Sequence, residues 1–208
     1  MRKRPKYWSK AIKHLSTKDP IMKNLIKKYQ DRYLVSRNDI FFSLCKSIIG
    51  QQISVKAADS IFNRFKAKCN FKINPKQVNK LKITNLRACG LSKQKCLGIK
   101  ELAKKLINKT FDPKKLKKMT DEEAIEYLVQ LRQIGKWSAE MVLLFTLNRP
   151  NIWPIQDIGL LKAISVNYKK KYLPPKLFVQ KLKKRFSPYC SVATWYLWRT
   201  IDNEPIQY

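Results

Sequence analysis

The feature of this chain that most limits its fold is the helical spacing of apolar residues along nearly its whole length. Segments 41–50, 57–65 and 97–107 carry apolar side chains three and four residues apart, which is the pattern of amphipathic helices. No convincing strand pattern interrupts them. At 208 residues, the chain is long enough to bury a core. The sequence therefore predicts an all-α protein of about a dozen helices, without a repeat or a linker.

Several helices have recognisable start signals. Asn74 and Asp112 each precede a proline, which is typical of an N-cap followed by the first helical residue. Thr120 and Glu123 have the spacing of a capping box. Gly135 lies between two predicted helices, where a tight turn would expose backbone N–H groups able to hold a phosphate. A glycine in this place is also common as a plain helix C-cap, so both interpretations stay open.

The charge of the chain favours a polyanionic partner. Lys and Arg number 45 against 14 Asp and Glu, which gives a formal net charge of +31. Such a field attracts nucleic acid. Association with RNA or the ribosome is the alternative, and a lysine-rich composition raises the count without any binding role.

The five cysteines, Cys45, Cys69, Cys89, Cys96 and Cys190, are odd in number and scattered. This argues against a disulfide framework and for a reducing, intracellular compartment. Their spacing does not fit a metal cluster, so we expect packing roles. The only histidine, His14, is assigned a packing or surface position. No apolar run reaches the roughly 20 residues that a membrane span needs.

Asp157 is a single carboxylate placed before an apolar segment, and two roles suit it. It fits the N-cap of a helix. The N–H groups of that helix would also keep the carboxylate ionised and fixed, facing positive charge in a substrate. Trp137, Trp195, Tyr196 and Trp198 supply aromatic faces that stack on bases and attract cationic rings, although aromatic residues at helical spacing also pack in cores. In so basic a chain, this combination indicates chemistry on a nucleic-acid base.

Six motifs occur in a characteristic order: Asp19-Pro20, SIIGQQIS at 47–54, LRACGLSKQK at 86–95, LRQIGKWSA at 131–139, RPNIWPIQDIGL at 149–160 and SVATWYLWR at 191–199. Together they resemble the helix-hairpin-helix DNA glycosylases, and specifically the DNA-3-methyladenine glycosylase II family. The resemblance implies two helical subdomains with the active site in the cleft between them and no N-terminal β domain. One subdomain would combine residues 1–35 and 150–208. The other would span 36–149 and end in the helix-hairpin-helix at about 124–147.

The resemblance also implies a function and its residues. The family flips alkylated purines, of the 3-methyladenine and 7-methylguanine type, out of duplex DNA and hydrolyses the N-glycosidic bond, which leaves an abasic site for base excision repair. The positions that match are Asp157 as the catalytic acid; Trp137, Trp198 and Met141 in the base pocket; Gln51 and Gln52 on the gap-filling loop; and Gln133, Gly135, Lys136 and Ser138 at a DNA phosphate. The hairpin of the family can hold Na⁺ or K⁺ through backbone carbonyls, here those of Val129, Leu131 and Ile134. No side-chain metal ligand and no required cofactor are expected.

Three positions distinguish this chain within the superfamily. Members that also cut the DNA backbone have a nucleophilic lysine where this chain has Trp137, and a Schiff base needs that amine. We therefore expect a monofunctional glycosylase without lyase activity. Gln133 replaces the first hairpin glycine. A glutamine at positive φ would be strained, so either the turn is slightly altered or the position tolerates a side chain. Gln156 replaces a second acid, which removes a like charge beside Asp157.

The expected partner is double-stranded DNA that contains damaged bases, bound by a monomer in the cytoplasm, nucleoid or nucleus, with no membrane association. Two alternatives remain from the sequence. One is a non-enzymatic DNA-binding protein on the same scaffold. The other is a glycosylase of this fold that acts on oxidised or deaminated bases.

Overall fold

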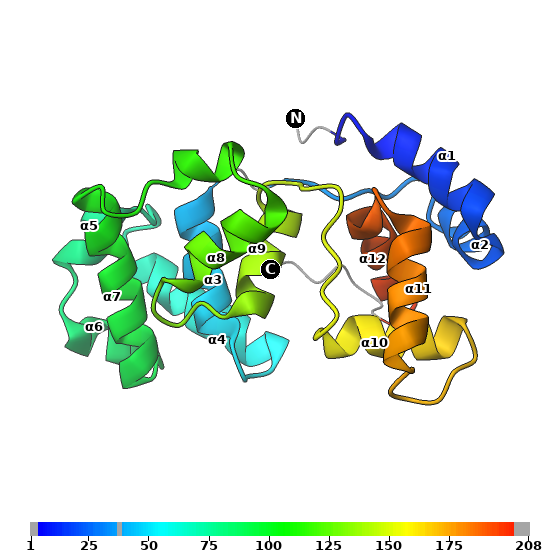
Figure 1. Ribbon diagram of the computed structural model, residues 1–208. Helices are drawn as coiled ribbons and strands as arrows, with labels where there is room; N and C mark the ends of the chain where they lie inside the picture. The colour runs from blue at the N-terminus through cyan, green and yellow to red at the C-terminus, as the bar shows by residue number, and fades with distance from the viewer. Residues whose placement is uncertain (1–3, 37–38, 202–208) are drawn as a thin grey trace. The chain divides into compact units, whose positions relative to one another are not determined.

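The computed structural model describes residues 4–36 and 39–201, and within these ranges every regular element is a helix. The predicted all-α class is thus confirmed. In chain order (Figure 1) the elements are α1 (Trp8–Lys18), α2 (Pro20–Lys28), α3 (Ile40–Gly50), α4 (Val55–Lys68), α5 (Pro75–Lys80), α6 (Ile83–Ala88), α7 (Lys93–Ile107), the 3-10 helix η1 (Pro113–Lys117), α8 (Asp121–Val129), α9 (Lys136–Phe145), α10 (Ile158–Asn167), α11 (Lys176–Phe186) and α12 (Cys190–Trp198).

The described residues fall into two compact units. Unit 1 contains residues 4–36 and 143–201, and unit 2 contains residues 39–142. The sequence-based prediction places the two boundaries after residues 35 and 149. In the structure the second boundary falls inside α9, so the last residues of that helix belong to unit 1.

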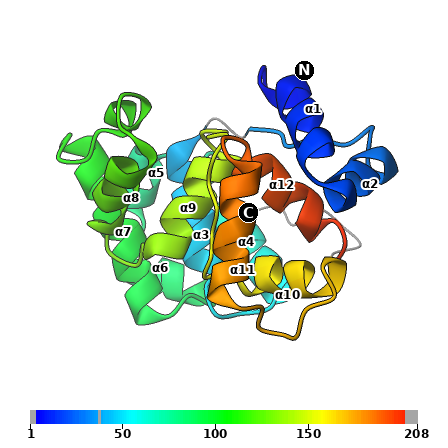
Figure 2. The same ribbon diagram turned by 45° about the vertical axis from the view of Figure 1, so that its right-hand side comes forward.

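In unit 2, α7 is the helix on which the others assemble. It packs against α3, α5 and α6, while α3 also packs against α4 (Figure 2). The core is formed by side chains with no exposed surface, among them Leu44, Ile48, Phe65, Leu86 and Ile99. These residues come from the apolar stripes of α3, α4, α6 and α7, so the predicted periodicity places the core correctly.

The predicted helix starts of unit 2 are confirmed. Asn74 Oδ1 accepts a hydrogen bond of 2.9 Å from Gln77 N, and Asp112 Oδ1 accepts one of 3.0 Å from Lys114 N. Thr120 and Glu123 form the reciprocal capping box, with bonds of 3.2 and 2.7 Å. These caps satisfy backbone donors that each helix leaves unpaired at its first turn.

In unit 1, α12 is the central helix. All nine of its residues are buried, and it contacts α1, α2, α10 and α11. A helix that is apolar all round can only be stable with neighbours on every side. Trp8 of α1 packs edge-on against Trp195 at a ring separation of 5.4 Å, and Tyr196 lies 5.8 Å from the same ring. For Trp195 and Tyr196, core packing is therefore the observed role.

Asp19 is only 1% exposed, and its carboxylate forms hydrogen bonds with residues of α2, of α11 and of the C-terminal end of α10. Its Oδ1 caps α2 by accepting 3.0 Å bonds from the N–H groups of Ile21 and Met22, and it also accepts from Tyr168 Oη at 3.1 Å. Its Oδ2 accepts a 2.6 Å bond from Arg185 of α11. Burial, and secondarily the Asp19 charge, raise the pKa of Tyr168, so the phenol stays a hydrogen-bond donor.

All five cysteines are buried and free. Burial raises the pKa of Cys69 to about 11 and that of Cys190 to about 12, which keeps these thiols protonated and unreactive. The His14 ring packs edge-on against Tyr189 at 5.5 Å. Within the described stretches, no group of three His, Cys, Asp or Glu side chains is arranged to hold a metal ion.

Candidate functional site

The Asp157 carboxylate is fixed at the N-terminus of α10. Its Oδ1 accepts a 2.6 Å bond from Leu160 N and a 2.9 Å bond from the indole Nε1 of Trp198. Asp157 is therefore the N-cap of α10, as predicted, and it is 8% exposed. Two N–H donors and the positive end of a helix dipole stabilise its negative charge and hold one orientation.

The chain around Asp157 is shaped to let the indole approach. A turn before the helix is closed by Asp157 N, which donates to Pro154 O at 2.9 Å. Gly159 follows in the first turn of α10. A β-carbon there would lie 3.1 Å from Asp157 Oδ1 and 3.4 Å from Trp198 Nε1. The absence of a side chain at Gly159 therefore leaves room for the bond between carboxylate and indole.

Trp198 is held from its other side by an aromatic ring. It is 2% exposed and stacks on Phe145 with a centroid separation of 5.7 Å and an interplanar angle of 10°. The structure thus brings together two residues that the sequence analysis assigned to the site, Asp157 and Trp198. Phe145 is a further residue of this cluster. The sequence analysis does not predict it, because nothing in its local sequence distinguishes it from an ordinary core residue.

The other two predicted base-pocket residues lie on α9, in unit 2. Trp137 is half-buried near the start of the helix, and Met141 is 2% exposed one turn later. Their spacing of four residues places them on the same face of α9. Their contact with a base stays a prediction.

The hairpin runs from α8 through residues 130–135 into α9. Leu131 N donates to Leu128 O and Ile134 N donates to Leu131 O, both at 3.0 Å, which folds the connection into tight turns. Gly135 directly precedes α9 and its carbonyl accepts from Ala139 N at 3.0 Å. The alternative that Gly135 is the C-cap of the preceding helix is therefore wrong, because α8 already ends at Val129.

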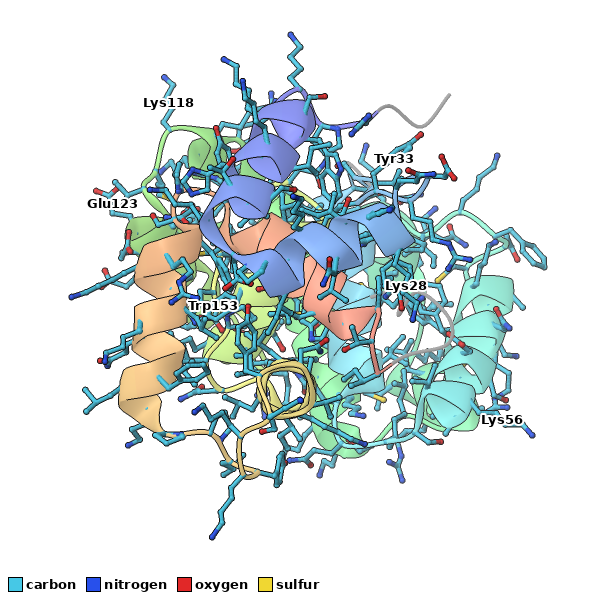
Figure 3. All side chains as sticks on the ribbon, turned by 90° about the vertical axis from the view of Figure 1, so that its right-hand side faces the viewer. Lys28, Tyr33, Lys56, Lys118, Glu123 and Trp153 are labelled. Carbon is cyan, nitrogen blue, oxygen red and sulfur yellow. The ribbon has the colours of Figure 1, made fainter. Side chains whose placement is uncertain are left out.

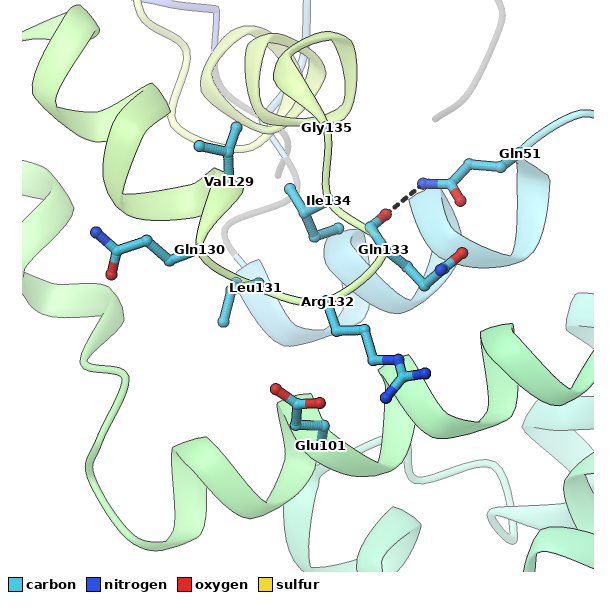
Figure 4. A pocket seen from close by; sticks show the side chains of 9 residues that line it. All are labelled: Gln51, Glu101, Val129, Gln130, Leu131, Arg132, Gln133, Ile134 and Gly135. Atoms are coloured by element: carbon cyan, nitrogen blue, oxygen red, sulfur yellow. Dashed lines mark hydrogen bonds between the residues drawn. The ribbon is translucent and has the colours of Figure 1, made fainter.

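The hairpin turn borders an open hollow of about 700 Å³ on unit 2 (Figure 4). Its lining residues come from α7, the end of α3 and the turn itself: Gln51, Glu101, Val129, Gln130, Leu131, Arg132, Gln133, Ile134 and Gly135. Of the predicted phosphate-binding residues, Gly135 and Lys136 are exposed, Gln133 is partly exposed and Ser138 is 3% exposed. Exposed backbone at the start of α9 can accept an anion, whereas the Ser138 side chain is turned into the protein.

Gln133 has φ +66°, so this position keeps the left-handed conformation that favours glycine and tolerates a side chain in it. The structure accommodates it through a second glycine. A β-carbon on Gly98 of α7 would lie only 2.9 Å from Gln133 Cγ and 3.3 Å from Arg132 O. The missing side chain at Gly98 therefore makes room for the Gln133 side chain. No local pattern in the sequence indicates this pairing.

The two glutamines of the predicted gap-filling loop have different surroundings. Gln51 Nε2 donates to Gln133 O at 2.6 Å and to Ser138 Oγ at 3.2 Å, so its side chain is bound to the hairpin (Figure 4). Gln52 is exposed and has φ +56°. Of the two, Gln52 is the exposed residue, and its entry into a gap in DNA stays a prediction.

Gln133→Gly should raise the free energy of unfolding by about 1 kcal/mol, because it removes a side chain from a left-handed conformation. Gln130→Gly is the matched control in the same turn. Gln130 has φ −67°, so glycine there should lower the free energy of unfolding by roughly 0.5–1 kcal/mol. Urea unfolding of both variants measures the two changes. Equal destabilisation would contradict strain at Gln133.

The surface charge agrees with a polyanionic partner. Exposed lysines such as Lys56 and Lys118 extend away from the ribbon (Figure 3). Among the described residues, no helix combines the length and apolarity needed to cross a membrane.

Comparisons with known proteins agree with these features. Residues 45–188 match the model of the HhH-GPD superfamily base excision DNA repair protein. DNA-3-methyladenine glycosylase 1 of Schizosaccharomyces pombe is 32% identical over 92% of this chain and 87% of its own length. The alkylbase DNA glycosidase-like protein mag2 of the same yeast is 31% identical over 92% and 93%. A solved structure of Schizosaccharomyces pombe 3-methyladenine DNA glycosylase Mag1 in complex with abasic DNA has a TM-score of 0.81 at 31% identity, covering 92% of this chain and 96% of that one.

Proposed function

Because this chain belongs to the HhH-GPD superfamily of base excision DNA repair proteins, we propose that it is a monofunctional DNA glycosylase for alkylated purines. The observation that carries the proposal is the Asp157 carboxylate, which two N–H donors fix at a helix N-terminus. The names of two full-length relatives, both alkylbase glycosylases or similar to them, support the substrate class. The abasic DNA bound to Mag1 corresponds to the product that such a reaction leaves.

The proposed reaction relies on the leaving group and on one fixed charge. A purine methylated at N3 or N7 is already cationic and departs without a strong general acid. Asp157 then stabilises the positive charge that develops on the sugar, or orients the attacking water, as carboxylates do in glycoside cleavage. For the flipped base we propose aromatic and thioether contacts from Trp137 and Met141, and from Trp198 beside the acid. Such contacts offset the few kcal/mol that flipping costs.

DNA anchoring is proposed at the hairpin. Backbone N–H groups around Gln133 and Gly135, with the Lys136 charge and the start of α9 near Ser138, would hold a phosphate. Val129, Leu131 and Ile134 line the same hollow, and we propose that their backbone carbonyls hold Na⁺ or K⁺, since carbonyl oxygens are ligands of the kind that these ions take. The logarithm of DNA affinity should fall by about 0.9 per log unit of salt for each phosphate contacted. Gln52, supported by Gln51, would fill the gap left by the base.

The proposal includes the absence of lyase activity. Trp137 occupies the position where a nucleophilic lysine would form a Schiff base, and an indole has no such amine. Borohydride added during turnover should trap no covalent DNA adduct, and strand breaks should appear only after alkali treatment of the product. A trapped adduct would contradict the monofunctional assignment, while base release without strand breaks would support it.

A panel of duplexes, each with one lesion, tests the substrate class. Release of 3-methyladenine and 7-methylguanine, with little release of 8-oxoguanine or uracil, is the expected result. Preferred release of an oxidised or deaminated base would show that the chain acts on one of the other substrate classes known for this fold. Binding to abasic DNA without release of any base would identify a DNA-binding protein. We place the enzyme inside the cell as a monomer, in the cytoplasm or with the DNA in the nucleoid or nucleus.

A further inference from the structure

We propose that Lys95 is a positioning residue for base flipping. Its hydrogen bonds fix the turn that carries Gln52, so that this gap-filling turn and the DNA-anchoring hairpin form one rigid element. This inference rests on the proposed glycosylase function. It concerns the step before bond cleavage, when the damaged base leaves the duplex and the protein must occupy the vacated space.

The ammonium group of Lys95 holds the end of α3. Lys95 Nζ donates to Ile49 O at 2.9 Å and to Gln51 O at 2.8 Å. Ile49 lies in the last turn of α3, and Gln51 is its C-cap with extended dihedral angles. The final carbonyls of a helix have no partner within it and carry partial negative charge. A lysine bonded to two of them therefore fixes where α3 ends and in which direction the chain continues into Gln52.

A second set of contacts joins this turn to the hairpin. The Gln51 side chain donates to Gln133 O at 2.6 Å and to Ser138 Oγ at 3.2 Å. The Gln133 side chain in turn lies against Gly98. Gly98 is three residues after Lys95 on α7, and residues at this spacing share one helix face. One face of α7 thus supports both the Gln51–Gln52 turn and the hairpin turn.

The physical benefit is preorganisation. A side chain that enters a duplex gap loses conformational entropy, and so does the turn that carries it. A turn that is already fixed in the free protein loses less conformational entropy when the DNA binds. Lys95 is half-buried, and this burial lowers its pKa. Without its two bonds, the end of α3 and the Gln52 turn would be less fixed, and the extrahelical base would be less populated.

Lys100 provides a matched control on the same helix. Its Nζ donates to Asn79 O at 2.5 Å and to Leu81 O at 2.8 Å. It too is half-buried, with a pKa lowered by burial. Lys100 therefore makes the same kind of contact with two carbonyls, but at the C-terminal end of α5 instead of the Gln52 turn. Lys95→Met and Lys100→Met remove equal charge and similar bonds.

The first measurement compares single-turnover release of 7-methylguanine from two duplexes. In one the lesion is paired with cytosine, and in the other it faces an abasic analogue, so that little pairing has to be broken. Lys95→Met should slow release from the paired duplex by about tenfold or more, given the strength of bonds to a charged donor. Release from the unpaired duplex should change by less than about threefold, because that flipping cost is absent. Lys100→Met should either slow release from both duplexes equally or leave release from both unchanged. Equal slowing of both duplexes by Lys95→Met would overturn the proposal.

The second measurement does not depend on catalysis. A duplex with an abasic analogue opposite 2-aminopurine reports entry of the protein into the gap through a change in fluorescence. The change should shrink with Lys95→Met and persist with Lys100→Met at saturating protein; equal changes in both would overturn the inference. If the wild-type protein releases no base, the proposed function fails, and this measurement still decides on Lys95. Should Lys95→Met not fold, Lys95→Gln, which is too short to reach both carbonyls, takes its place in both assays.

Discussion

Asp157→Asn should reduce release of alkylated purines by about a hundredfold to a thousandfold, the effect of removing one preorganised electrostatic contact to a transition state. The asparagine side chain keeps the size of the carboxylate and an oxygen that can accept from Leu160 N and Trp198 Nε1, which both contact Oδ1. It loses the negative charge that the developing sugar cation needs. Single-turnover kinetics on a duplex containing 7-methylguanine measures the change.

The matched control for this variant is Asp39→Asn. Asp39 is also the N-cap of a helix and accepts a 2.9 Å bond from Phe42 N, but it is exposed. Its replacement should leave base release unchanged. The Asp157→Asn protein should also bind abasic-site DNA as tightly as the wild type does. A variant that kept a tenth or more of the wild-type rate would exclude Asp157 as the catalytic carboxylate.

Asp19→Ala should lower the free energy of unfolding by about 2–4 kcal/mol, the combined effect of a lost N-cap and of lost hydrogen bonds to a buried carboxylate whose ion-pair partner Arg185 is itself exposed. The alanine leaves the Ile21 and Met22 N–H groups uncapped, and it takes from Tyr168 and Arg185 the acceptor that they share. Three helices of unit 1 lose their common contact. Urea unfolding followed by circular dichroism measures the loss.

The comparison for this second variant is Asp39→Ala, which removes an exposed cap that accepts a hydrogen bond from Phe42 N. That change should cost about 1 kcal/mol, the usual contribution of an N-cap. Similar losses for the two variants would show that Asp19 acts as a cap alone and that its bonds to Tyr168 and Arg185 contribute little.

The helices were predictable because their signals are local. Apolar spacing of three and four residues marks the buried face of α3 or α7, and a cap such as Asn74 or Thr120 acts on N–H groups two or three residues away. Asp157 belongs to the same class, since its bond to Leu160 N spans three residues. The hairpin motif left two possibilities for Gln133, an altered turn or a tolerated side chain, and the structure shows the side chain at positive φ.

The surroundings of these residues could not be predicted in the same way. Trp198 was expected to face a base, but no rule of spacing indicates that its indole donates to a carboxylate 41 positions away. Gln51 and Gln52 look equivalent in sequence, yet only Gln51 is bound to the hairpin, through a contact that spans 82 positions. The pairing of Gly98 with Gln133 likewise joins two elements that no local pattern connects.

The sequence by itself determined the helices, their caps and the order of the motifs, because hydrogen bonds within a helix and its apolar stripe depend on residues at most a few positions apart. The tertiary structure alone decided which donor holds the Asp157 carboxylate, which glutamine is free and which lysine fixes the end of α3. These contacts exist only after chain packing brings distant segments within hydrogen-bonding distance, and many sequences with the same local pattern could pack differently.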